Sequence, residues 1–173
     1  MSHPLIYRLD KDLIGGNSKK MKIIFLDIDG VLNRHSYGTH IVLVDELVEN
    51  LKKIMNATNA KIVLSTFWRG HPEYIKYILN NYEIDPSKII GVTPGSDKST
   101  LGKIYKSEVR SNQILEWVNS NKSKIYSYVI LDDREYAALG KMQLNRFVKT
   151  HSNLGLTQED VTEAINILNN PIN

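Results

Sequence analysis

Short apolar runs alternate with amphipathic segments along this chain, and this alternation limits the possible folds more than any other feature. The apolar runs have the length of β-strands and are rich in Ile, Val and Leu. Such runs are typical of parallel sheets, whose strands are buried because helices cover both faces. The runs are Lys22–Ile28, Lys61–Ser65, Lys88–Gly91, Tyr126–Leu131 and Arg146–Thr150.

Between these runs, apolar residues recur with the spacing of a helix. We expect Asp45 to cap the first helix, Pro72 to lie in the first turn of the second, and Trp117 to face the core from the third. Thr157 and Asp160 have the spacing of a capping box and open the last helix. The sequence therefore predicts an α/β fold, a Rossmann-like doubly wound parallel sheet of about five strands with helices on both faces.

Composition excludes several classes of function. The chain has no cysteine, which excludes disulfides, a disulfide-linked partner, thiolate catalysis and cysteine-ligated zinc. No apolar run approaches the ~20 residues that span a bilayer. We therefore expect a cytoplasmic, intracellular protein without a membrane partner. The net charge of +3 suits an anionic substrate, although so small an excess does not by itself indicate nucleic-acid binding.

The chain is the size of one domain. Residues 1–20 predict an N-terminal extension, because Gly15-Gly16-Asn17-Ser18 forms a flexible joint, and residues 21–173 predict the domain itself. The segments Leu32–Asp45 and Gly91–Lys106 are too short for a large cap domain. We therefore expect an open site that admits a bulky substrate.

Two acids, Asp27 and Asp29, follow the first apolar run, and Gly30 permits a sharp turn directly after them. In open α/β sheets the ligand lies outside the carboxyl ends of the strands. Two carboxylates this close repel each other unless a cation lies between them, which indicates a metal site. A solvated acid pair at the end of a surface strand is the alternative interpretation of so short a motif.

Adjacent acids, Asp132 and Asp133, end the fourth apolar run. Magnesium prefers octahedral oxygen ligands and takes one or two carboxylates from a protein. Asp27, the backbone carbonyl of Asp29 and one of these two acids would supply such a shell. The sequence therefore predicts Mg²⁺ as the cofactor.

The second apolar run ends in hydroxyl residues, Ser65 and Thr66. A hydroxyl there can donate a hydrogen bond to a phosphate oxygen, although a turn or a helix cap is its commoner role. Arg69 could bind phosphate through its guanidinium. For Trp68, core packing is the favoured interpretation over a stacking face.

A cation is expected to bridge the phosphate and the first acid. Arg110, at the start of the third helix, is our candidate, with Lys103 and Lys106 as competitors and a solvated surface arginine as the other interpretation. We expect four residues to contact the substrate: Gly30, Thr66, Arg69 and Lys103.

The order of these features resembles that of the haloacid dehalogenase (HAD) superfamily, over roughly residues 21–168. The resemblance implies an aspartate nucleophile, an aspartate general acid/base two residues later, a hydroxyl that holds the phosphoryl group, and a cation where the superfamily usually has lysine. On this chain these positions are Asp27, Asp29, Ser65 and Arg110, with Asp133 as the direct metal ligand and Asp132 beside it.

The strings FLDIDGVLN, AKIVLSTFWR and YVILDDREY are similar to HAD domains called Swiss Army Knife RNA repair-like. Leu131–Arg134 is also similar to the phosphatase half of polynucleotide kinase-phosphatases. These resemblances imply a phosphorylated substrate such as a polynucleotide end or a nucleotide.

The sequence thus predicts a magnesium-dependent phosphomonoester hydrolase that forms an aspartyl-phosphate on Asp27. One alternative is a catalytically silent module that binds phosphorylated nucleic-acid ends. Another is a receiver-like phosphorylatable domain. In receivers the acid pair comes on the first strand and a lone aspartate comes later, whereas here Asp132 and Asp133 come late as a pair.

Overall fold

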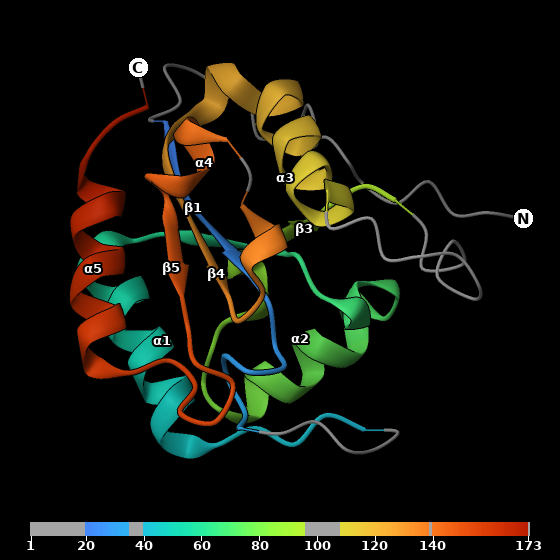
Figure 1. Cartoon of the computed structure of the whole chain (residues 1–173). Helices are drawn as coiled ribbons and strands as arrows, with labels where there is room; N and C mark the ends of the chain where they lie inside the picture. Colours follow the sequence, from blue (N-terminus) through green and yellow to red (C-terminus); the bar gives the residue numbers. More distant parts are fainter. Residues whose placement is uncertain (1–19, 35–39, 96–107, 139, 173) are drawn as a thin grey trace, which may run out of the picture.

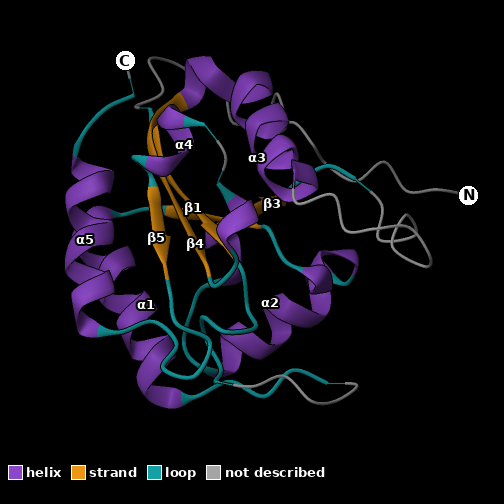
Figure 2. Cartoon of the chain, in the orientation of Figure 1, coloured by secondary structure: helices purple, strands orange, loops and turns teal. Residues whose placement is uncertain are grey.

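The computed structural model of the chain describes residues 20–34, 40–95, 108–138 and 140–172 (Figure 1). The predicted N-terminal extension lies outside these residues except for Lys20. Helices and strands alternate along the chain (Figure 2). They are β1 (Met21–Leu26), α1 (Asp45–Thr58), β2 (Lys61–Leu64), α2 (Pro72–Asn81), β3 (Ile89–Val92), α3 (Glu108–Asn121), β4 (Ile125–Asp132), α4 (Lys141–Leu144), β5 (Phe147–Lys149) and α5 (Gln158–Asn169), with the short 3-10 helices η2 (Phe67–Gly70), η3 (Pro86–Lys88), η5 (Lys122–Lys124) and η6 (Glu135–Ala137).

The strands form one five-stranded sheet in the order β3-β2-β1-β4-β5, and every neighbouring pair is parallel. The chain runs outward from β1 through β2 to β3 and then crosses back to place β4 on the other side of β1. In such a sheet the crevice for a ligand lies where the strand order reverses, outside the carboxyl ends of the strands. Here the reversal falls between β1 and β4.

Alternate residues of β1 face two different hydrophobic cores, as the period of a strand requires. Ile24 and Leu26 belong to the larger core, which α1, α2 and α5 complete. Ile23 and Phe25 belong to the second core, which includes residues of α3. Helices thus cover both faces of the sheet, with α1 and α5 together on one side and α3 on the other (Figure 1). The predicted Rossmann-like doubly wound fold is confirmed, and the described residues form no cap domain.

Two of the predicted helix features agree with the structure in detail. Pro72 is in the first turn of α2, and Thr157 and Asp160 form the expected capping box at the start of α5. The prediction for Asp45 was wrong, because Val44 holds the cap position of α1 without a side-chain hydrogen bond. Asp45 is the first residue of the helix, where its negative charge still favours the positive end of the helix dipole.

The first strand ends two residues earlier than the apolar run that predicts it. The carbonyl of Ile28 accepts hydrogen bonds from the N–H groups of Val31 (3.2 Å) and Leu32 (2.9 Å), so the chain has already turned away from the sheet. Gly30 adopts a φ of +77° within this turn. Asp27 still pairs with β4 through its N–H, whereas Asp29 lies within the turn beyond the sheet edge.

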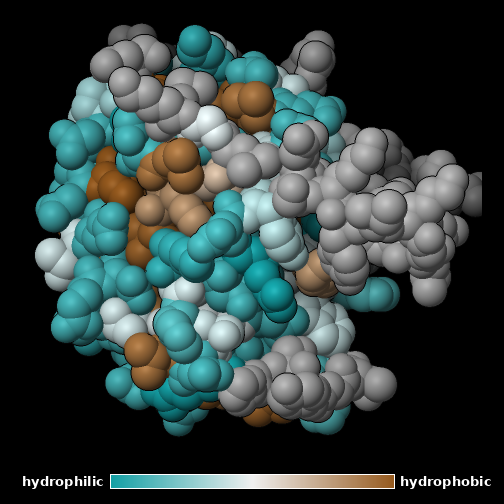
Figure 3. Space-filling model, in the orientation of Figure 1, coloured by the Kyte–Doolittle hydropathy of each residue, from teal (hydrophilic) through white to brown (hydrophobic). Residues whose placement is uncertain are grey.

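Hydrophilic residues cover most of the face in Figure 3, and hydrophobic residues form small, separate groups on it. None of the described helices is long and apolar enough to cross a lipid bilayer. The large hydrophobic residues that are exposed in the described part of the chain are Val42, Phe67, Tyr74, Tyr77, Leu144 and Leu154.

Phe25 fixes α3 against the sheet. Its ring is fully buried and meets the rings of Trp117 and Tyr128 edge-on, at centroid distances of 5.5 and 5.6 Å. We predict that Phe25→Ala lowers the free energy of unfolding by about 3–5 kcal/mol, as chemical denaturation would measure. Tyr77→Ala is the control, because Tyr77 is 66% exposed. A loss for Phe25→Ala no larger than that of the control would contradict this packing.

Candidate active site

Asp27 directly follows β1, and Asp132 is the last residue of the neighbouring strand β4. Leu26 of β1 is in register with Leu131 of β4, and the N–H of Asp27 donates to the carbonyl of Leu131 at 3.0 Å. The two aspartates therefore follow paired residues of parallel strands. This places both at the reversal point of the sheet.

Asp133 completes a cluster of three carboxylates. One oxygen each from Asp27, Asp132 and Asp133 lie within 4.8 Å of one another, and this is the one such group that the described residues form. Asp27 and Asp132 are buried, and Asp133 is partly buried. Carboxylates this close together and this poorly solvated need a compensating positive charge.

Arg110 supplies one positive charge from α3. Its Nη1 donates to Asp27 Oδ2 and to Asp132 Oδ2, each at 2.5 Å. The side chain is only 5% exposed, so the interpretation as a solvated surface arginine was wrong. Burial lowers the pKa of Arg110, but the two carboxylates raise it by more, and its pKa is raised overall. The guanidinium is therefore charged at any physiological pH.

Asp132 is the acid most affected by burial. Burial and the charge of Asp27 raise its pKa to about 8, although Arg110 and a hydrogen bond from the N–H of Arg134 (2.8 Å to Oδ1) oppose this shift. Burial also raises the pKa of Asp133, against the pull of the Arg134 guanidinium, whose Nε lies 3.2 Å from Oδ1. Burial is the largest cause of both shifts, because a buried carboxylate loses the solvation of its charge.

The cluster fits a divalent cation. With every group ionised, three carboxylates face the guanidinium groups of Arg110 and Arg134, which leaves an excess of negative charge, and hard oxygen donors suit Mg²⁺. Both oxygens of Asp132 accept hydrogen bonds, from Arg110 and from the backbone of Arg134. Both oxygens of Asp27 do so as well, from Arg110 and from the N–H of Ile28. Hydrogen bonding therefore does not decide between these two acids, and the assignment of Asp27 and Asp133 as the direct ligands stays a prediction.

Asp29 lies outside the cluster and is bound by two donors. Trp68 Nε1 donates to its Oδ2 at 2.9 Å, and Asn33 Nδ2 donates to its Oδ1 at 2.8 Å. Asn33 Oδ1 in turn accepts from the N–H of Gly30 at 3.0 Å. The carboxylate of Asp29 is thereby held by two donors outside the cluster, and the metal contact of its backbone carbonyl stays a prediction.

The contacts of Trp68 and Asn33 with Asp29 were not predicted from the sequence. Trp68 does pack against the larger core, as favoured, but its indole N–H also binds the candidate acid/base. A buried tryptophan usually has a hydrogen-bond acceptor for its indole N–H. This general need is the one signal in the sequence that could have suggested an acid as the partner of Trp68. The signal for Asn33 was its place three residues after Gly30, since asparagine side chains bind the backbone of tight turns.

Ser65 has a buried hydroxyl and follows β2, the strand beside β1. Its N–H donates to the carbonyl of Leu26 at 2.9 Å, and its side chain is buried. Within the described part of the chain, its Oγ has no hydrogen-bond partner. Buried polar groups are rarely left without a hydrogen-bond partner. The hydroxyl of Ser65 is therefore available to bind a polar atom of a ligand.

The other residues expected to contact the substrate or its phosphate are Thr66, Arg69, Lys103 and Lys106. Thr66 Oγ1 accepts from the N–H of Trp68 at 3.4 Å and caps η2, and Arg69 Nη1 donates to the carbonyl of Thr66 at 3.1 Å. Both side chains are buried and stabilise the turn after β2. Lys103 and Lys106 lie outside the described residues. A substrate contact of these residues stays a prediction.

Gly30 allows Asp133 to approach the turn that carries Asp29. A Cβ at Gly30 would lie 2.6 Å from Asp133 Cγ and 2.7 Å from its Oδ2. The carbonyl of Gly30 is fixed from the other side by Thr150 Oγ1, which donates to it at 2.8 Å. Glycine is thus needed at this position both for its φ of +77° and for space.

Two aromatic side chains that the sequence analysis did not single out flank Arg110. Its Cζ lies 5.0 Å from the ring centre of Phe67 and 5.9 Å from that of Tyr136. Phe67 precedes Trp68 in η2, and Tyr136 is in η6. Phe67 is exposed and Tyr136 is partly buried, and we call these two rings the rim of the site.

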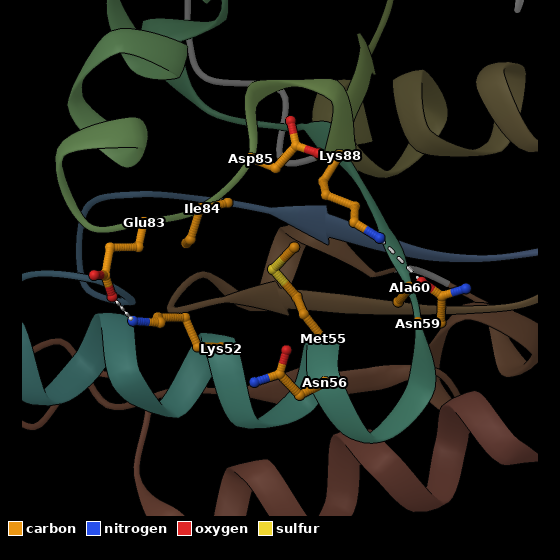
Figure 4. Close-up of a pocket in the computed structure, with 9 residues that line it drawn as sticks. All are labelled: Lys52, Met55, Asn56, Asn59, Ala60, Glu83, Ile84, Asp85 and Lys88. Carbon is orange, nitrogen blue, oxygen red and sulfur yellow. Dashed lines mark hydrogen bonds and ion pairs between the residues drawn. The ribbon is translucent and has the colours of Figure 1, made fainter.

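A separate hollow of about 360 Å³ lies at the opposite, amino edge of the sheet, where β2 and β3 begin (Figure 4). Its charged side chains already have partners, since Lys52 binds Glu83 at 3.1 Å and Lys88 binds Asn59 Oδ1 at 3.0 Å. It contains none of the clustered aspartates. The candidate active site is therefore the carboxyl edge.

Comparison with known proteins gives the family of the chain. The family model described as HAD domain in Swiss Army Knife RNA repair proteins matches residues 23–161, which include every element from β1 into α5. A search of curated proteins and a search of solved structures returned no match.

The Gly30 contact can be tested with a matched pair of glycines. Gly140 has a similar φ of +82°, but a Cβ there would meet nothing within 4 Å. We predict that Gly30→Ala weakens Mg²⁺ binding by about 10–100-fold, because the new Cβ displaces Asp133, while Gly140→Ala binds as the native protein does. Titration calorimetry measures both. Equal affinities in the two variants would contradict the role of Asp133.

Proposed function

Because the chain belongs to the family of HAD domains in Swiss Army Knife RNA repair proteins, we propose that it is a magnesium-dependent phosphomonoester hydrolase. The observation that carries this proposal is Asp27 itself. It is buried at the reversal point of the sheet, ion-paired with Arg110 and adjacent to further carboxylates. Such a group can act as a nucleophile toward phosphorus.

In the first step, a carboxylate oxygen of Asp27 attacks phosphorus in line. The bond between phosphorus and the ester oxygen breaks, and an aspartyl-phosphate forms. Asp29 donates a proton to the leaving oxygen, so that an alcohol departs. The hydrogen bonds from Trp68 and Asn33 hold Asp29 in place for this transfer.

In the second step, Asp29 takes a proton from a water molecule that attacks the phosphorus of the aspartyl-phosphate. Inorganic phosphate leaves and Asp27 is restored as a carboxylate. An acid two residues after the nucleophile favours turnover over a long-lived phosphorylated state. This supports a hydrolase over a receiver-like domain.

The attack of one anion on another requires positive charge and hydrogen-bond donors at the site. Arg110 remains charged, and the Ser65 hydroxyl has a hydrogen bond to give to a phosphoryl oxygen. Asp27 and Asp133, with the backbone carbonyl of Asp29, would hold Mg²⁺. When bound, Mg²⁺ would supply further neutralisation of the phosphate oxygens.

The proposed substrate is a phosphorylated polynucleotide end or a nucleotide. The description of the matching family supports this, since it refers to RNA repair proteins. The proposal includes an open site with room for a large leaving group, and residues 20–34, 40–95, 108–138 and 140–172 form no cap domain. At an open site, small sugar phosphates would be poorer substrates.

The first test is the loss of the nucleophile. We predict that the native protein releases phosphate from p-nitrophenyl phosphate and from 3′- or 5′-phosphorylated oligonucleotides only with Mg²⁺. Asp27→Asn should lower kcat by at least about a thousandfold. Asp85→Asn, at an exposed carboxylate that binds Ser87 on a separate turn, should retain native activity. Activity that survives in Asp27→Asn, or a native protein without release, would refute the proposal.

A second test uses the unsatisfied hydroxyl of Ser65. We predict that Ser65→Ala lowers kcat/KM by about 10–100-fold, as expected for one hydrogen bond to a charged phosphoryl group, without lowering the free energy of unfolding. Ser127 is the matched control, because its buried Oγ donates to the carbonyl of Leu168 at 2.9 Å. Ser127→Ala should lower the free energy of unfolding by about 1 kcal/mol and retain activity. The opposite pattern would assign Ser65 a structural role.

A further inference from the structure

The rings of Phe67 and Tyr136 at the rim have no role in the proposed phosphatase chemistry. Phe67 is 44% exposed and belongs to neither hydrophobic core, so folding does not account for its ring. Tyr136 comes from a different part of the chain and is partly buried. Both rings nevertheless lie against the guanidinium of Arg110, the group that binds the nucleophile.

The distance from Phe67 to the nucleophile suits one nucleotide. Arg110 Nη1 lies 2.5 Å from Asp27 Oδ2, and Arg110 Cζ lies 5.0 Å from the Phe67 ring centre. With a C–N bond of about 1.3 Å, the ring centre is within about 9 Å of the attacking carboxylate. A phosphate in contact with Asp27 would bring the base of its own or the next nucleotide to this ring.

The chemistry of the rim also favours a base. The guanidinium lies over the Phe67 ring, which leaves the exposed part of the ring for a ligand. Aromatic side chains bind nucleobases by stacking, which tolerates any base sequence. The nearby positive charge of Arg110 attracts the phosphate to which the base is linked. A bare sugar phosphate offers no ring for this contact.

We propose that Phe67 is the platform on which the nucleobase beside the reacting phosphate stacks, with Tyr136 completing an aromatic rim. The rim selects nucleotides and polynucleotide ends over sugar phosphates. This inference rests on the proposed phosphatase function and names the feature of the substrate that the site reads. Phe67 is a specificity residue in this account, and Asp27 and Asp29 carry out the chemistry.

The test compares two nucleotides with a sugar phosphate that has no base. Values of kcat/KM are measured for adenosine 5′-monophosphate, adenosine 3′-monophosphate and ribose 5-phosphate, with Mg²⁺. We expect Phe67→Leu, which keeps an apolar side chain but removes the ring, to lower the ratio of the better nucleotide to ribose 5-phosphate by about tenfold. Tyr77→Leu is the matched control, since Tyr77 is an exposed aromatic residue of α2, and its ratio should equal the native one.

Two results would overturn the inference. One is an unchanged ratio of nucleotide to ribose 5-phosphate in Phe67→Leu; if both values fall equally, Phe67 only positions Arg110. The other is a native preference for a phosphotyrosine peptide over both nucleotides, which would assign the rim to another ligand.

A binding measurement separates this inference from the proposed function. If the native protein hydrolyses none of the substrates, the phosphatase proposal fails, and calorimetry decides the role of Phe67. Adenosine 5′-monophosphate is titrated into Asp27→Asn and into the double variant Asp27→Asn/Phe67→Leu. Binding about tenfold weaker in the double variant supports stacking, and equal affinity refutes it.

Discussion

The buried ion pairs of Arg110 with Asp27 and Asp132 are the interaction on which the rest of this structure depends. One guanidinium nitrogen joins the ends of β1 and β4 to α3. Removing one member of such a group leaves an uncompensated charge in a poorly solvated place, which is strongly destabilising. The packing of Phe25 against Trp117 holds the same helix against the same strand. Hydrophobic packing and charge thus fix α3 in one position.

The same group of charges accounts for what the site can bind. Three carboxylates and two guanidinium groups leave excess negative charge, which a divalent cation can neutralise. Gly30 lets Asp133 reach the cluster, and the turn around Gly30 raises Asp29 to where Trp68 and Asn33 bind it. Asp27 precedes this tight turn and Asp29 lies within it, and the two carboxylates have separate partners. In the proposed mechanism, this separation lets one carboxylate attack phosphorus while the other transfers a proton.

The fold was predictable from the sequence because strand and helix periods alternate without interruption. The meeting of Asp27 with Asp132 was predictable for a related reason, since carboxyl ends of parallel strands share one edge. Arg110 could not be separated from Lys103 and Lys106 by spacing. Its place next to the acids depends on how α3 packs, which is a tertiary property.

The contacts that the sequence analysis missed depend on local turns. Whether Trp68 reaches Asp29 is decided by the capped turn of η2, where Thr66 accepts from the N–H of Trp68. Phe67 of η2 and Tyr136 of η6 are far apart in the sequence, and they share a contact only because both rings lie near the guanidinium of Arg110. Periodicity carries no information on such contacts between irregular segments.

The central claim is that Asp27 receives the phosphoryl group from the substrate. The most direct measurement uses Asp29→Asn, which still presents the nucleophile but can neither protonate a leaving group nor activate water. This variant is mixed with Mg²⁺ and p-nitrophenyl phosphate, whose phenolate departs without a proton, and is then quenched in acid and digested for tandem mass spectrometry. The account predicts a phosphoryl group on Asp27. A phosphoryl group on another residue, or phosphate release without any modified residue at early times, would contradict it.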